Sequence, residues 1–268
     1  MSRDAAFEAL RLAEVHDSIE LLQRHGKSAG DLLEIGAGRG WQARALSEAG
    51  YKVEAIDLPP TNAISGHALK RHWPIRDYDG VHIPFPDDSF DVIYSSNVLE
   101  HVEHLGLLMD EMKRVLRPGG IALHLLPNPQ WRILSLLTYY PGQMTDLLRY
   151  LRRQSEAFRS TSTVPPSLDR PAQSLIGKMF KRLAPPTHGA VGSPLGEIRR
   201  YSRSRWDRFF RDCGWEIIDH FNNGLLASGD YLLGSAFGID ARRKAGRMIG
   251  GIAHVYVLRP SSSNGLGR

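Results

Sequence analysis

Cysteine is almost absent from this 268-residue chain, which contains only Cys213. A single thiol excludes an internal disulfide framework and a zinc site built from several cysteines. Long apolar runs are also lacking, since no stretch approaches the roughly 18 residues of a membrane-spanning helix. The segment Met1–Leu12 carries charges without an apolar core, unlike a secretory signal. These absences predict a cytoplasmic protein.

Charge is unevenly distributed along the chain. Residues 1–128 carry 13 basic and 19 acidic side chains, a net of −6, whereas residues 129–213 carry 15 and 6, a net of +9. The basic segment suits an anionic substrate, a nucleic acid or an acidic membrane surface. A solvated basic surface without a partner is the simpler alternative.

Short apolar segments alternate with helical patterns in both parts of the chain. Strands are predicted at 31–35, 52–57, near 73–78, at 90–95, 121–126, near 215–220 and 254–258. Helices are predicted at 4–25, 41–48, 102–116, 131–153, 172–183 and 204–213, and Pro118-Gly119-Gly120 is interpreted as a stop signal. Strands and helices that alternate at this spacing imply βαβ units and a mostly parallel sheet.

A cluster of glycines follows the first strand. It reads Glu34-x-Gly36-x-Gly38-x-Gly40, with one residue between the last two glycines. The dinucleotide fingerprint has two residues there, and the Gly-Lys-Ser/Thr ending of a phosphate loop is missing. Asp57 then ends the second strand, where a carboxylate can accept both hydroxyls of a ribose. The pattern indicates a nucleoside site that does not demand a pyrophosphate.

Five motifs in this order resemble a large family of class I S-adenosylmethionine-dependent methyltransferases, that of the ubiquinone-biosynthesis type. They are Leu33–Gly40, Val53–Asp57, Asp79–Ile93, Asn97–Val102 and Leu116–Gly120. Together with the strand pattern, the resemblance predicts an α/β fold with a Rossmann-like, doubly wound, mostly parallel seven-stranded sheet. A helical insertion separates strands five and six. The predicted parts are a cofactor-binding core at 1–128, a substrate lid at 129–203, the rest of the core at 204–260 and a disordered tail at 261–268.

The resemblance implies a role for each matching residue. The glycines would pass along the methionine part of S-adenosylmethionine, with Glu34 fixing their loop and Asp57 holding the ribose. Asp79 would accept a hydrogen bond from the adenine amine, and the Gly80 N–H would reach the ring. The residues implied to line the cofactor are Glu34, Gly36, Gly38, Gly40, Asp57, Asp79, Gly80, Ser96 and Asn97.

Acceptor recognition is assigned to the second half of the chain. His101 and His188 are the candidate catalytic bases, which are needed only if the acceptor is a hydroxyl or a protonated amine. Glu197 and Arg200 are candidate substrate contacts. A purely structural role is the alternative for each of the four. No metal site is predicted, because His101 and His104 lack a third ligand.

The predicted function is methyl transfer to a small or amphiphilic acceptor, such as a saccharide, a lipid-linked intermediate or a natural product. The aromatic and basic segment 131–153 suits either a lid or a helix in peripheral contact with a membrane. One alternative is RNA or DNA methylation by the basic half, which Ser95-Ser96-Asn97-Val98 weakens because nucleobase-amine enzymes carry Asn-Pro-Pro-Tyr there. Another alternative is a non-catalytic binding module.

Overall fold

The computed structural model describes residues 3–59, 71–160, 188, 193, 195–226 and 238–261. In this part of the chain the strands are β1 (Gly30–Ile35), β2 (Tyr51–Asp57), β3 (Arg76–Asp77), β4 (Phe90–Ser96), β5 (Leu116–Pro127), β6 (Trp215–Asn222) and β7 (Ala253–Pro260). The helices are α1 (Arg3–Arg24), α2 (Trp41–Glu48), the 3₁₀ turn η1 (Leu99–His101), α3 (Leu105–Val115), α4 (Pro129–Ser160), α6 (Gly196–Arg200), α7 (Arg203–Asp212) and α9 (Ile239–Ile249).

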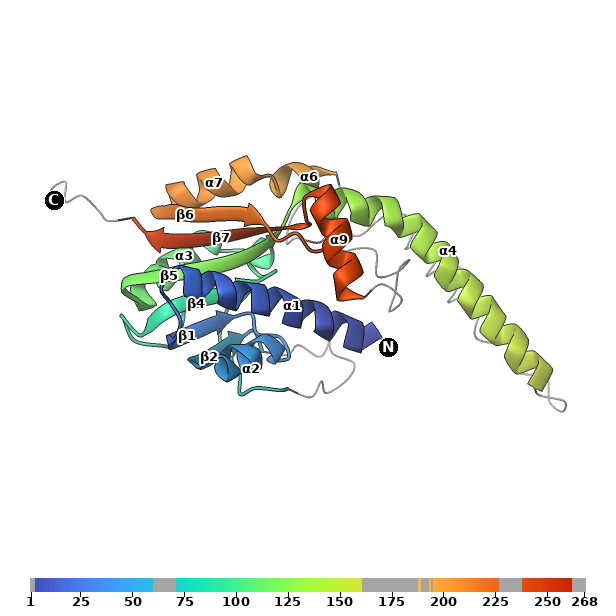
Figure 1. Ribbon diagram of the computed structural model, residues 1–268, viewed down its shortest axis with the longest axis horizontal. Coiled ribbons are helices and arrows are strands. Elements are labelled where there is room, and N and C mark those ends of the chain that lie inside the picture. The colour runs from blue at the N-terminus through green and yellow to red at the C-terminus, as the bar shows by residue number, and fades with distance from the viewer. Residues whose placement is uncertain are drawn as a thin grey trace.

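The strands form one twisted sheet in the order β3-β2-β1-β4-β5-β7-β6 (Figure 1). β1 to β5 run parallel, and β7 runs antiparallel to both of its neighbours. The predicted α/β class and the mostly parallel seven-stranded sheet are confirmed.

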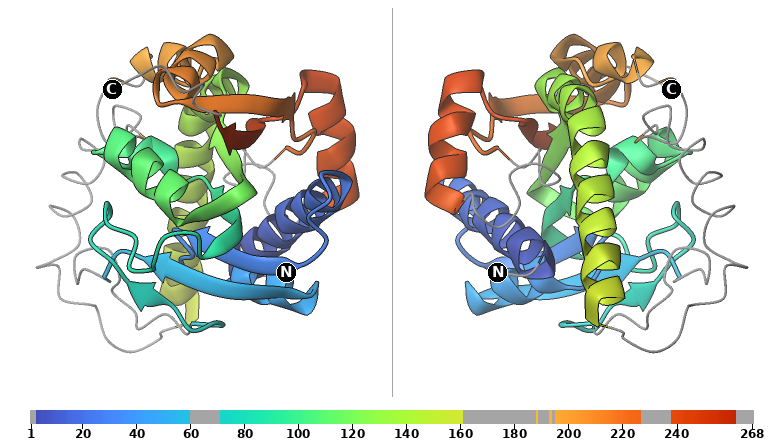
Figure 2. Two further views of the ribbon diagram at one scale, coloured as in Figure 1. Left: turned by 90° about the vertical axis from the view of Figure 1, so that its left-hand side faces the viewer. Right: turned by 90° about the vertical axis from the view of Figure 1, so that its right-hand side faces the viewer.

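Helices cover both faces of the sheet because neighbouring residues on a strand point in opposite directions. Leu32 packs with α1 and α2, whereas Leu33 packs with α3 and α7. α9 lies beside α1 on the first face, where Leu10 and Ala13 form a small cluster with Leu225 and Ile239 (Figure 2). This two-sided burial explains the near-continuous apolar strands that the sequence shows.

The boundaries around the fifth strand differ from the prediction. The helix predicted to start at Val102 starts at Leu105, after the separate turn η1, and β5 already begins at Leu116. Pro118-Gly119-Gly120 therefore lies inside β5 and not outside it. Phe90 pairs with Leu116, and the register then shifts before Val92 pairs with Ile121. This irregularity in the pairing accommodates Pro118, which cannot donate a ladder hydrogen bond, and Gly119, whose φ is +78°.

Two further helices, α6 and α9, were not predicted. The helix predicted at 131–153 is present as the longer α4, which projects away from the sheet (Figure 1). The predicted helix 172–183 and the tail after Ser261 lie outside the described residues. Within the residues that the structure describes, no helix is both long enough and apolar enough to cross a membrane.

The centre of the sheet buries titratable side chains without neutralising partners. His124 of β5 is fully buried and shares a 2.8 Å hydrogen bond with the Ser95 hydroxyl. Burial lowers the pKa of His124 to about 3 and that of His254 in β7 to about 4. Both imidazoles are therefore neutral in the folded protein at every pH above about 5.

Folding stability is expected to fall as the pH drops from about 6.5 toward 4. The unfolded chain takes up protons on these histidines below their ordinary pKa near 6.5, whereas the folded chain does not. Each such histidine contributes a slope of about 1.4 kcal/mol per pH unit in that window. Urea unfolding between pH 7 and pH 4.5 measures the slope, which His124→Asn should reduce by about one histidine's share. An identical slope in the two proteins would contradict the assignment.

Candidate functional site

The sheet reverses its strand order beside β1, which pairs with β2 on one side and β4 on the other. In an open α/β sheet, ligands bind outside the carboxyl ends of the strands at such a switch point. The loops that leave β1, β2, β3 and β4 all start at this edge. Every residue that the sequence analysis assigned to the cofactor lies at the carboxyl end of one of these strands or in the loop that follows it.

The three glycines of the loop after β1 have different environments. A Cβ on Gly36 would lie 2.3 Å from Cγ2 of Val98, and one on Gly40 would lie 2.6 Å from Cβ of Trp73. Gly38 has φ of +57° and open space around it. The outer glycines therefore allow close packing within the protein, while the middle one leaves its main chain open to a ligand.

Glu34 anchors the base of this loop. Its residue is 1% exposed, and its Oε2 has no hydrogen-bond partner. Burial, followed by the charge of Asp57, raises the pKa of Glu34 to about 8. A cation bound over the loop would favour the charged form of this carboxyl group and lower its pKa again, and S-adenosylmethionine carries both an ammonium and a sulfonium.

Asp57 ends β2 directly opposite the glycine loop. Its Oδ2 accepts a 2.5 Å hydrogen bond from the Gly38 N–H, and its Oδ1 accepts one of 2.7 Å from the Leu58 N–H. Burial and then the charges of Asp57 and Asp79 raise the pKa of Tyr78 to about 12. Both carboxylates therefore act on one region beside β2 and β3, where a ribose and an adenine are predicted.

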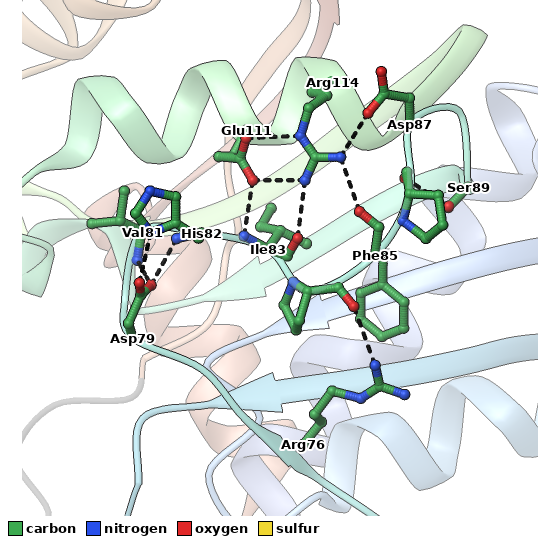
Figure 3. Close-up of polar contacts among 12 residues, drawn as sticks. Arg76, Asp79, Val81, His82, Ile83, Phe85, Asp87, Ser89, Glu111 and Arg114 are labelled. Carbon is green, nitrogen blue, oxygen red and sulfur yellow. Dashed lines mark hydrogen bonds and ion pairs between the residues drawn. The ribbon is translucent and has the colours of Figure 1, made fainter.

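Asp79 caps the turn that follows β3 (Figure 3). Its Oδ1 accepts hydrogen bonds from the N–H groups of Val81 and His82, and its Oδ2 pairs with the His82 ring at 2.6 Å. These hydrogen bonds, that of the His82 side chain first, lower the pKa of Asp79 to about 2. Gly80 follows with φ of +91° and lies against Leu58. The carboxylate is thus charged and fixed, and its predicted contact with adenine stays a prediction.

Arg114 of α3 holds this segment in place (Figure 3). Its guanidinium donates to the carbonyl oxygens of Ile83 and Phe85, each at 2.9 Å, and to Asp87 at 2.8 Å. It also forms two hydrogen bonds to Glu111, whose Oε2 accepts the Ile83 N–H at 3.0 Å. The loop that presents Asp79 is therefore bound to α3 through the side chains of Arg114 and Glu111. Asp87 has the structural role that the turn requires.

The loop after β4 supplies the other wall of the crevice. Asn97 has φ of +55°, and its N–H donates to the Leu125 carbonyl oxygen. Its side chain donates to the Ser96 hydroxyl at 3.0 Å, which also accepts from Arg11 of α1 at 3.2 Å. Ser96 and Asn97 thus lie at the predicted edge of the sheet. Arg11, which the sequence analysis missed, joins them from 85 residues away.

Glu100, His101 and His188 come together just beyond this wall. The imidazole centroids of His101 and His188 are 4.7 Å apart, and Nε2 of each ring lies 3.7 Å from Glu100 Oε1. Burial is the largest cause of the lowered pKa of His101. The structure therefore brings the two base candidates together around one carboxylate.

Glu197 binds the main chain at His188. It is fully buried, accepts the His188 N–H at 2.7 Å and forms an ion pair with Arg132 at 2.9 Å. The Trp131 ring lies 4.5 Å from the His188 ring. Glu197 thus connects α6 to the main chain at His188 and to Arg132 of α4. The acceptor contacts expected of Glu197 and Arg200 remain predictions.

Residues 33–124 match the model of a family described as "Methyltransferase domain". An uncharacterized methyltransferase from Mycolicibacterium vanbaalenii is 38% identical over 151 residues, which are 55% of this chain and 56% of that protein. A "Probable S-adenosylmethionine-dependent methyltransferase" from Mycolicibacterium smegmatis is 29% identical over 146 residues, 54% of each chain. A solved SAM-dependent methyltransferase from Aquifex aeolicus has 14% identity and a TM-score of 0.45, with 90% of this chain and 89% of that one covered. The chain spans just over half the length of these two curated relatives.

Replacing Arg114 by leucine should weaken binding of S-adenosylhomocysteine by about tenfold, since the loop with Asp79 loses its anchor on α3. Arg117→Leu is the matched control. Arg117 also pairs with two carboxylates, Asp31 and Asp91, but at the amino ends of β1 and β4. Titration calorimetry on both variants makes the comparison, and equal losses would contradict a specific role for Arg114.

Proposed function

Because residues 33–124 belong to the family of class I S-adenosylmethionine-dependent methyltransferase domains, we propose that the chain methylates a small or amphiphilic acceptor. The observation that carries this proposal is the open main chain at Gly38, opposite Asp57 at the switch point of the sheet. Bound S-adenosylmethionine supplies an electrophilic methyl group on a sulfonium.

The protein's contribution is to hold the two reactants. Asp57 would accept the ribose hydroxyls in exchange for the hydrogen bond that it accepts from the Gly38 N–H. Ser96 and Asn97 lie at the end of β4, between the glycine loop and η1. The acceptor approaches from the side of Glu100, His101 and His188. Alignment of its nucleophilic atom with the methyl group provides much of the acceleration in such a displacement.

The surface of α4 favours an amphiphilic acceptor. Five large apolar side chains are exposed along it at helical spacing, with exposed fractions from 44% to 69%: Ile133, Leu137, Tyr140, Met144 and Leu148. We call these five residues the α4 stripe. The helix starts beside the candidate site, where Trp131 contacts His188, and extends away from the sheet (Figure 1). An acceptor with a polar reactive group and an apolar tail, presented in a lipid surface, suits this arrangement.

Binding of S-adenosylmethionine and S-adenosylhomocysteine should be weakened about 10- to 100-fold by Asp57→Ala, since a ribose would lose two charge-assisted hydrogen bonds. Glu48→Ala removes an equally charged side chain that pairs only with Arg44 on the surface of α2 among the described contacts, and should bind normally. Calorimetric titration of the three proteins, with unfolding curves to verify the fold, is the measurement. Absence of binding by folded wild type would remove the proposed function.

Leu137→Gln, Met144→Gln and Leu148→Gln combined should reduce sedimentation with phosphatidylcholine–phosphatidylglycerol vesicles by about tenfold or more, because each side chain would lose apolar burial in the lipid. These side chains are exposed, so stability and cofactor affinity should stay unchanged. A triple Gln variant at Arg44, Glu48 and Lys52 provides the control. Equal sedimentation of all proteins would contradict a lipid-facing α4 stripe.

A further inference from the structure

Three potential metal ligands converge beside the proposed methyl-transfer site, although they come from distant parts of the sequence. Glu100 and His101 belong to η1, and His188 precedes α6. One ligand atom from each residue lies within 4.8 Å of the other two. This is a close grouping of two imidazoles and one carboxylate, the donor types that bind Zn²⁺ and other first-row divalent ions.

The Glu100 carboxylate accepts no hydrogen bond from the described part of the chain. Its side chain is fully buried, and neither oxygen has a hydrogen-bond partner. Taking a charged carboxylate out of water without hydrogen bonds is costly, so an unmatched group of this kind calls for an explanation. A bound cation supplies one.

The distances fit a shared ion better than direct pairing. Nε2 of His101 and Nε2 of His188 each lie 3.7 Å from Glu100 Oε1, beyond hydrogen-bonding distance. Ligand atoms bound about 2.1 Å from a tetrahedral metal ion are separated by about 3.4 Å. A small closure of the three side chains around an ion would therefore complete the site.

The two histidines are accessible and partly fixed. Their side chains are 44% and 37% exposed, which leaves a path for an ion from solvent. His188 is held by Glu197 and by the Trp131 ring. The chain before η1 is fixed by Val98 against Gly36. The other charged groups nearby, Arg11, Arg132 and Glu197, are engaged with partners of their own.

We propose that Glu100, His101 and His188 form a binding site for a first-row divalent metal ion of the Zn²⁺ class, with a fourth position open to an oxygen atom of the acceptor. This inference rests on the proposed function for the identity of that fourth ligand. The site selects acceptors with a hydroxyl or another oxygen donor at the reactive end. It also assigns the histidine nitrogens to the metal, so neither serves as a proton acceptor while the ion is bound.

The test uses the full chain, freed of metal by a chelator, and does not require turnover. Calorimetric titration with Zn²⁺ should give one ion per chain, and Co²⁺ should give the visible absorption bands of a low-coordinate site. Glu100→Gln and His188→Ala should each weaken binding by at least about tenfold. His104→Ala is the control, because His104 is exposed, lies three residues from His101 and is not part of the cluster.

Thermal unfolding provides an independent readout. Zn²⁺ should raise the Tm of wild type and of His104→Ala, but not that of Glu100→Gln, because an ion stabilises only the state that binds it. Without metal, Glu100→Gln should unfold at the same or a higher temperature than wild type, since it replaces a buried carboxyl group that accepts no hydrogen bond. If Glu100→Gln fails to fold, His188→Ala still decides the point.

The outcomes separate the two proposals. No Zn²⁺ binding, or binding that His104→Ala loses as much as His188→Ala, overturns the metal site while titration with S-adenosylhomocysteine leaves the proposed function intact. Metal binding without binding of S-adenosylhomocysteine would support the metal site and contradict the proposed function. Metal-free protein that methylates a hydroxyl acceptor at an undiminished rate, with activity lost as His101 is protonated, would assign that histidine as a base and overturn the metal proposal.

Discussion

The close contact between Gly36 and Val98 is the constraint on which the site depends. No side chain can occupy the space that a Cβ on Gly36 would need, since Val98 fills it. The contact binds the loop after β1 to the loop after β4 at the place where the sheet reverses direction. The proposed cofactor side, with Gly38 and Asp57, and the proposed acceptor side, with Glu100 and His101, are thereby held at one edge.

Two buried carboxyl groups at this edge lack compensating hydrogen bonds in the described structure. Glu34 ends up at the base of the glycine loop and Glu100 in η1, and each has at least one oxygen without a hydrogen-bond partner. By contrast, Glu111 and Asp87 both accept hydrogen bonds from Arg114. Buried polar groups without partners tend to mark places where a ligand completes the structure. The proposed cofactor and the proposed divalent ion are both cationic. Each would therefore be attracted to one of these buried carboxyl groups.

The cofactor side could be predicted from the sequence because its information is local. A glycine at a strand end and an acid at the end of the next strand occupy fixed places in a βαβ unit, so the sequence could predict that Gly38 and Asp57 lie at the same edge of the sheet. The strands were predicted for the same reason, except that β5 begins earlier and includes Pro118 and Gly119 through a register shift.

The proposed acceptor side depends on contacts between distant residues. Nothing in the spacing of His188 shows that it lies beside Glu100, or that Arg11 reaches Ser96. α6 was missed because it is only five residues long, whereas α9 is amphipathic and was overlooked in spite of its pattern.

The most direct test of the central claim is a crystal structure of the chain with S-adenosylhomocysteine. We expect the ligand across the carboxyl ends of β1 and β4, with its ribose hydroxyls on Asp57, its adenine beside Asp79 and Gly80, and its sulfur facing the loop of Ser96 and Asn97. Asp57 should then have exchanged its hydrogen bond from Gly38 for the ribose. Ligand density at any other place on the protein, or an Asp57 that still binds Gly38 beside a fully bound ligand, would contradict the account.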